Sequence, residues 1–238
     1  MAEKVQKVLP HGELEELAPG LWSLTGSLPM PLRRNMIVYR LPDRSLLLHS
    51  VIALDESGMA KLDALGKPAI MIVPASGHRM DAVFYKRRYP KLKVISPAAS
   101  RAKVEQVIKT EGTCEEVLPA LGIGLHPMLG FRQGEIAYEL PINPPLNGGR
   151  ALVLCDALAN ADHPPGLGGK LVEVVLGGVK TRLGVPRIVR VMMVKEKEAA
   201  RGAIKRLAEI KNLEVISVAH GRPVRGNCAE ALREAATF

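Results

Sequence analysis

The chain has 238 residues, of which 47% are hydrophobic and 3% aromatic, and it carries a formal net charge of +9. This length suits one large domain with one core, which we expect to span residues 1–238. Scarce aromatic rings disfavour a binder of single-stranded nucleic acid, and no segment is apolar enough to predict a transmembrane helix or a secretory signal.

The first half of the chain is predicted to open with strands and to continue with helix–strand units. Apolar runs indicate the strands, and apolar residues at helical spacing indicate the helices. The predicted elements are strands at Leu21–Thr25, Asn35–Leu41 and Ser45–Ser50, a helix at Asp55–Leu65 that ends before Gly66, a strand at Ala69–Val73, a helix at His78–Tyr89, a strand at Leu92–Ile95 and a helix at Ser100–Lys109.

The second half repeats this arrangement around a long irregular stretch. We predict strands at Glu116–Leu118, Glu135–Leu140 and Ala151–Leu154, a functional flap at residues 156–185, a helix at Glu196–Ile210, a strand at Val215–Val218 and a helix at Asn227–Ala236. A doubly wound sheet would not open with three successive strands. The order of elements therefore predicts an α/β fold, specifically a four-layer αββα sandwich.

The cysteines are few and widely separated. Cys114, Cys155 and Cys228 are odd in number and form no CxxC pair. This pattern argues against a disulfide framework or a zinc knuckle and indicates reduced thiols in a cytoplasmic protein. Each cysteine is expected to serve as a small buried hydrophobic residue.

Several segments, in their order and spacing, resemble the metallo-β-lactamase superfamily, and within it an uncharacterised branch with a degenerate metal site. The segments that carry this resemblance cover most of the chain: residues 35–43, 47–50, 62–66, 73–78, 89–90, 154–156, 185–187 and 219–221. The resemblance implies the sandwich fold and a metal-dependent hydrolase-like activity.

The resemblance also implies a reduced set of metal ligands. Hydrolases of the superfamily hold two metals, with a His-x-His-x-Asp-His loop after a buried strand. Here the corresponding loop keeps only His78 and Asp81, three residues apart. Asp156 matches the bridging aspartate and His220 the last histidine, whereas His126 stands in for a third-motif histidine without the flanking pattern.

The surviving residues make the ligand set of a mononuclear centre. His78, Asp156 and His220 all follow predicted buried strands, and α/β sheets gather their sites at such strand ends. Two imidazoles and one carboxylate can hold one zinc or iron ion at most. Asp81 is predicted to be the catalytic residue, as a base or water-orienting group, although a fourth ligand or a partner of a ligand is also open. Arg187 is predicted to bind an anionic substrate, or else to hold the late loop by a salt bridge.

Each candidate also has a structural alternative. His78 could cap a helix, Asp156 could form an Asx turn, and His220 could belong to an ordinary strand-to-helix turn. Of the other histidines and their neighbours, His49 is expected to be buried and hydrogen-bonded, Asp162 and His163 to be solvent-exposed, and His11 and His126 to lie in loops.

Three classes of function remain open from the sequence. The first is a hydrolase with one metal that acts on a small ester, lactone or phosphoester. The alternative is a metal-free binding or regulatory pseudoenzyme on the same fold, possessing the fold but no metal chemistry. A nucleic-acid binder is disfavoured, because Lys and Arg are scattered and aromatic residues scarce, and no membrane partner is expected. The substrate, the pathway and the oligomeric state are not encoded in any motif.

Overall fold

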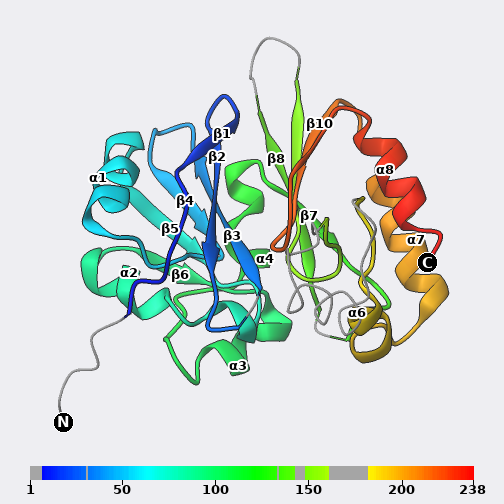
Figure 1. Cartoon of the computed structure of the whole chain (residues 1–238), viewed down its shortest axis with the longest axis horizontal. Helices are drawn as coiled ribbons and strands as arrows, with labels where there is room; N and C mark the ends of the chain where they lie inside the picture. The colour runs from blue at the N-terminus through cyan, green and yellow to red at the C-terminus, as the bar shows by residue number, and fades with distance from the viewer. Residues whose placement is uncertain (1–6, 31, 133, 143–147, 161–181) are drawn as a thin grey trace.

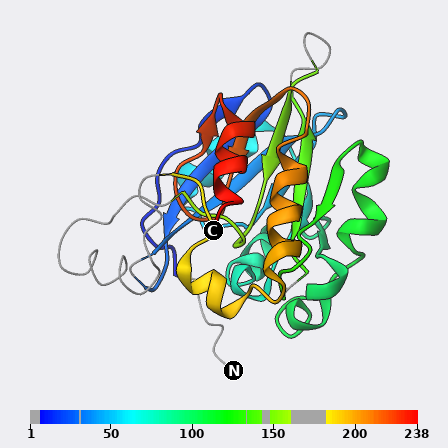
Figure 2. The same ribbon diagram turned by 90° about the vertical axis from the view of Figure 1, so that its right-hand side faces the viewer.

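The computed structural model describes residues 7–30, 32–132, 134–142, 148–160 and 182–238. Two mixed β-sheets pack face to face, and helices cover the outer face of each sheet (Figure 1). The turned view in Figure 2 shows α7 and α8 lying side by side across the second sheet. The predicted four-layer αββα sandwich is confirmed.

The first sheet has the strand order β1-β2-β3-β4-β5-β6. Strands β1 to β4 pair antiparallel, and β4, β5 and β6 pair parallel. Side chains alternate between the two faces, so that Ile37 and Tyr39 point to the other sheet while Met36 and Val38 pack under the helices. The strands are β1 (Glu15–Ala18), β2 (Leu21–Ser27), β3 (Arg33–Arg40), β4 (Leu46–His49), β5 (Pro68–Ile72) and β6 (Lys93–Ile95).

The second sheet has the order β11-β10-β9-β8-β7, with β9 and β10 as its parallel pair. Ala151 and Val153 face the first sheet, whereas Leu152 packs against the helices. Both faces of β9 are therefore buried after Arg150, which explains why residues 151–154 form a continuous apolar run. The strands are β7 (Gly124–Pro127), β8 (Ile136–Pro141), β9 (Arg150–Val153), β10 (Leu213–Ser217) and β11 (Val224–Arg225).

Local interactions determine where helix α1 begins and ends. α1 begins where the Asp55 side chain accepts a hydrogen bond from the Gly58 amide, and it ends at Gly66. Gly66 has a φ of 151°, and a Cβ there would lie 2.5 Å from the Arg44 carbonyl oxygen, so glycine is required. The helices are α1 (Glu56–Leu65), α2 (Ala82–Arg88), α3 (Arg101–Val104), α4 (Cys114–Val117), α6 (Arg187–Met192), α7 (Lys197–Leu207) and α8 (Cys228–Ala235), with 3₁₀ turns η1 (Ser76–His78), η2 (Ala98–Ser100) and η3 (Pro119–Leu121).

Some predicted elements are wrong. The predicted strand at Glu116–Leu118 overlaps helix α4, which a capping box starts: the Thr113 side chain accepts from the Glu116 amide while the Glu116 carboxylate accepts from the Thr113 amide. The predicted helix at His78–Tyr89 begins only at Ala82, since His78 belongs to η1. The helix predicted at Ser100–Lys109 is the short α3, and strands β1 and β7 and helix α6 were not predicted.

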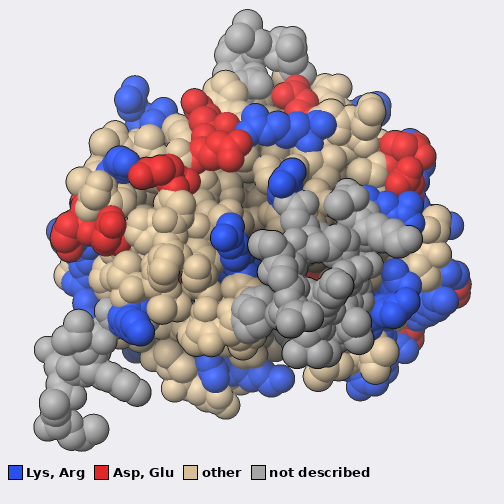
Figure 3. Space-filling model, in the orientation of Figure 1, with Lys and Arg blue, Asp and Glu red and all other residues tan. Residues whose placement is uncertain are grey.

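The surface charge is distributed in separate groups. On the face drawn in Figure 3, Lys and Arg side chains lie in several clusters with Asp and Glu among them. The basic run at the end of α2 is partly paired, because Lys86 contacts Glu111 at 2.9 Å and Arg88 contacts Glu56 at 3.1 Å. Cys114, Cys155 and Cys228 are free and buried, as predicted. Among the described residues, no helix combines the length and apolar character that crossing a bilayer requires.

Candidate metal centre

Three strand ends converge where the two sheets meet. His78 closes η1, just after β5, while Asp156 and His220 follow β9 and β10. Because β9 and β10 are parallel neighbours, their carboxyl ends reach the same edge of the second sheet. Residues 78 and 64 positions apart along the chain are thereby brought into one cluster.

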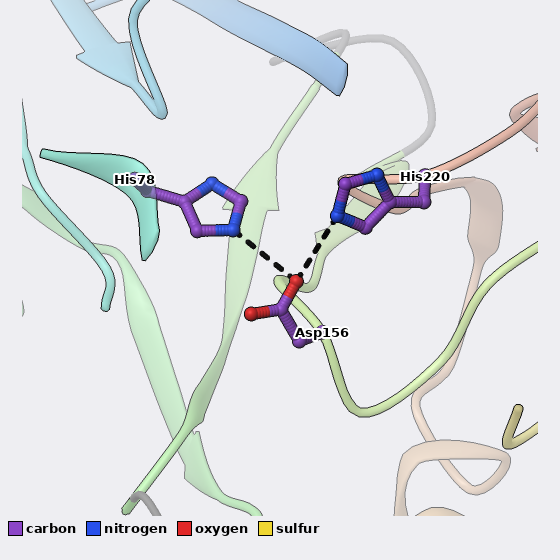
Figure 4. Close-up of side chains that lie close together, drawn as sticks. All are labelled: His78, Asp156 and His220. Atoms are coloured by element: carbon purple, nitrogen blue, oxygen red, sulfur yellow. Dashed lines mark hydrogen bonds and ion pairs between the residues drawn. The ribbon is translucent and has the colours of Figure 1, made fainter. Parts of the chain in front are cut away.

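The three side chains meet at one carboxylate oxygen. Asp156 Oδ1 lies 3.2 Å from His78 Nε2 and 3.3 Å from His220 Nε2 (Figure 4). One ligand atom from each residue lies within 4.8 Å of the other two. The His78 side chain is buried, whereas those of Asp156 and His220 remain 24% and 18% exposed. The cluster therefore has a buried side and a side open to solvent.

Each imidazole is oriented through its other nitrogen. His220 Nδ1 donates to the Arg33 carbonyl oxygen at 2.7 Å, and since a carbonyl only accepts, this bond places a hydrogen on Nδ1. His78 Nδ1 contacts the buried Ser50 hydroxyl at 2.7 Å. Ser50 adopts a left-handed φ of 56°, which a non-glycine residue keeps only where its surroundings impose it. Both rings thus turn Nε2 toward Asp156, as metal-binding histidines with anchored second nitrogens do.

The donor spacing suits a tetrahedral ion. Ligand atoms about 2.0–2.1 Å from a zinc ion at tetrahedral angles lie about 3.3 Å from one another. The two separations between Nε2 atoms and Asp156 Oδ1, 3.2 and 3.3 Å, match that edge. The ligand atoms of all three residues lie within 4.8 Å of one another. The residues present therefore fit one ion of this kind.

Electrostatics keep Asp156 ionised. Burial alone would raise the pKa of its carboxyl, but the charge of His78 and the hydrogen bonds from His220 and His78 hold the pKa well below its ordinary value. The buried Arg34 guanidinium is close enough for its charge to interact with Asp156. An ionised carboxylate is the form that a metal ion requires.

Glu135 supports the turn that carries Asp156. Its buried carboxylate accepts hydrogen bonds from the backbone amides of Cys155 at 2.8 Å, Asp156 at 3.1 Å and Ala157 at 2.7 Å. Burial and the neighbouring charge of Asp156 raise the pKa of Glu135 to about 8, while the three amides act in the opposite direction. Glu135 was predicted only as the start of a strand, and no local pattern marks this role.

Asn35 supports the turn that carries His220. The Asn35 side-chain amide donates to the carbonyl oxygens of Val218 at 2.8 Å and Gly221 at 2.7 Å, and its backbone amide donates to that of Ala219 at 2.8 Å. Asn35 lies on β3 of the first sheet, so these bonds join the two sheets directly beside His220. Only the fold reveals this contact, which spans 183 and 186 positions of sequence.

Asp81 lies beside the cluster and is engaged with Arg34. Its Oδ2 atom is 2.9 Å from Arg34 Nη2, and the Arg34 side chain is only 1% exposed. The same guanidinium donates to the carbonyl oxygens of Val51 at 2.8 Å and Gly77 at 3.4 Å. Asp81 also lines a hollow of about 410 Å³. Its contact with Arg34 holds the loop between β5 and α2 against β3, and a catalytic role for Asp81 stays a prediction.

The remaining candidates lie outside the cluster. His49 is buried, and among the described residues its ring nitrogens have no hydrogen-bond partner, so the expected hydrogen bond is not found. His126 lies in β7, not in a loop, and pairs with Glu139 at 2.8 Å. His11 forms an isolated bridge with Gly26. Arg187 is exposed at the first position of α6, and its substrate role stays a prediction.

The flap predicted at residues 156–185, including Asp162 and His163, lies largely outside the described residues.

Comparison with solved structures finds the same fold at low sequence identity. The metallo-β-lactamase FIM-1 from Pseudomonas aeruginosa, in its mono-zinc form, is 13% identical and aligns over 97% of this chain and 96% of its own, with a TM-score of 0.61. The chain has the metallo-β-lactamase fold. A metallo-β-lactamase from Erythrobacter litoralis aligns with 13% identity over 97% and 99% of the two chains, with a TM-score of 0.61. The metallo-β-lactamase DIM-1 aligns with 11% identity over 97% and 98%, with a TM-score of 0.62.

Comparison of the sequence itself finds no match. No protein-family model matches the metallo-β-lactamase-fold chain, and no curated protein matches it. At identities of 11–13% the structural likeness establishes the fold alone. The chemistry must therefore be argued from the cluster of His78, Asp156 and His220.

Proposed function

We propose that the protein is a metal-dependent hydrolase with one metal ion, held by His78, Asp156 and His220. The observation that carries the proposal is the convergence of two imidazole Nε2 atoms on one carboxylate oxygen, with both Nδ1 atoms anchored by other groups. Hydrogen bonds that fix the second nitrogen of each imidazole are typical of metal-binding histidines. The mono-zinc form of FIM-1 supports one zinc ion as the occupant, with iron as the other candidate.

The chain's own residues would organise the reaction around this ion. When bound, a divalent ion supplies Lewis acidity, which lowers the pKa of water and polarises a carbonyl or phosphoryl oxygen. Ser50 and the Arg33 carbonyl keep the imidazoles turned inward, and Asp156 provides the negative charge. Asp81 is proposed to orient water or to hold Arg34 near the site, and Arg187 to attract an anionic substrate. The substrate class is a small ester, lactone or phosphoester.

The alternative is a metal-free binding or regulatory protein of the same fold. It is favoured by the fact that Asp156 already contacts both imidazoles, so the cluster satisfies its own charges without an ion. A cytoplasmic location is part of either proposal and is supported by the three free thiols.

A reconstitution experiment separates these two functions. Protein stripped with a chelator is reloaded with zinc or ferrous iron and assayed with nitrophenyl acetate, a lactone and bis-nitrophenyl phosphate. We expect metal-dependent turnover of at least one substrate, lost in His220→Ala and kept in His126→Ala, the matched control outside the cluster. Turnover that is absent in every loaded sample, or equal in the His220→Ala variant, would refute the hydrolase.

A further inference from the structure

The loop that presents Asp156 is held from the inside of the fold by Glu135. Glu135 is 6% exposed and lies 20 to 22 positions before the residues it contacts. One oxygen, Oε1, accepts from the Cys155 amide, and the other, Oε2, accepts from the amides of Asp156 and Ala157. The carboxylate therefore binds three consecutive peptide units at the point where β9 has ended.

Three consecutive bonds fix the direction of the Asp156 side chain. A peptide plane whose N–H is hydrogen-bonded to a buried acceptor cannot rotate freely without leaving that N–H unsatisfied. With the amides of residues 155–157 directed to Glu135, the Asp156 side chain extends toward His78 and His220. The same carboxylate accepts from the amides of the buried Cys155 and Ala157, for which the described part of the chain offers no other acceptor.

Glu139, four residues after Glu135 and on β8, offers a comparison because its carboxylate forms an ion pair with a side chain. Glu139 Oε2 lies 2.8 Å from His126 Nε2 and Glu139 Oε1 lies 2.9 Å from Arg150 Nε, near the surface. Glu135 instead uses its two oxygens on backbone amides beside the metal-binding cluster.

We propose that Glu135 is the positioning residue of the metal centre. Its carboxylate clamps the Asp156 turn so that Oδ1 stands 3.2 and 3.3 Å from the two Nε2 atoms before an ion arrives. A ligand set formed in advance binds its ion more tightly, because no ordering of the loop has to accompany binding. This inference rests on the proposed function of the cluster as a metal centre.

Glu135→Gln tests the clamp with little change of shape. The substitution turns one acceptor oxygen into an NH₂ group, which opposes at least one of the three backbone amides. We expect the dissociation constant for zinc, measured by competition with a chromogenic chelator, to rise about 10- to 100-fold. Glu139→Gln, which removes a carboxylate four residues further along the chain, on β8, should leave the affinity unchanged. Circular dichroism checks whether each variant is folded, and Glu135→Asp replaces Glu135→Gln if the latter does not fold.

Amide hydrogen exchange in the metal-free protein tests the same clamp without any metal. Exchange at residues 155–157 should accelerate in Glu135→Gln and stay unchanged in Glu139→Gln. Unchanged exchange would overturn the clamp, and faster exchange with unaltered zinc affinity would overturn the positioning role. If the wild-type protein itself binds no zinc, the proposed function and the positioning role both fail, while accelerated exchange would still identify Glu135 as the tie that holds the loop.

Discussion

Asp81→Asn perturbs the buried contact with Arg34 at almost constant volume. Asp81 Oδ2 and Arg34 Nη2 are 2.9 Å apart, and their side chains are 12% and 1% exposed. Removing one partner of a buried ion pair costs about 3–5 kcal/mol, because the other charge stays buried. Arg34 keeps the carbonyl oxygens of Val51 and Gly77, so we expect a loss near the lower end, about 3 kcal/mol. For a chain of this size that loss lowers Tm by about 6–12 °C.

Urea unfolding of the wild-type protein and the variant measures this loss. Glu15→Gln is the control, since Glu15 pairs with Arg225 at 2.9 Å on the surface and its side chain is 70% exposed. That pair should contribute less than about 1 kcal/mol. If Asp81→Asn keeps its stability within about 0.5 kcal/mol and instead loses turnover, Asp81 acts in catalysis and our reasoning about Arg34 is wrong.

Three further predictions concern His49, Ser50 and His220. Burial lowers the pKa of His49 to about 3, so the unfolded chain takes up a proton below about pH 6.5 that the folded chain does not. Stability should therefore fall by about 2 kcal/mol more between pH 7 and pH 5 in the wild type than in His49→Phe, and equal slopes in denaturant titrations would contradict this. Ser50→Ala removes the hydroxyl 2.7 Å from His78 Nδ1 and should weaken zinc binding about 10-fold, whereas an unchanged zinc titration would exclude this support. His220→Ala removes a ligand and should weaken zinc binding by more than about 100-fold with the fold retained, and calorimetry that finds wild-type affinity would remove His220 from the site.

The sandwich could be predicted because several of its strands appear in the sequence as local apolar runs. Apolar runs such as Ala69–Val73 and Ala151–Leu154 are typical of strands buried on both faces, and they mark β5 and β9. The strand at Glu116–Leu118 was predicted wrongly, although the Thr113-x-x-Glu116 pattern of a capping box was present to indicate a helix. The short α6 and the strand β7 have too few residues for a clear period.

The candidate site was predictable only in part. His78, Asp156 and His220 each follow a buried strand, and that position, together with the family resemblance, was enough to bring them together. Their supports were not predictable, because Glu135 and Asn35 act across 20 to 186 positions through backbone groups. The pairing of Asp81 with Arg34 was missed for the same reason, since it spans 47 positions.

Elemental analysis of the protein, purified without a chelator or a histidine tag, tests the central claim most directly. One imidazole in the loop after β5, together with Asp156 and His220, provides ligands for a single ion. We predict one zinc or iron per chain in the wild type and a large loss of metal in His220→Ala purified in parallel. Two tightly held ions per chain would contradict the reduced site, and none after growth in metal-replete medium would contradict the metal centre itself.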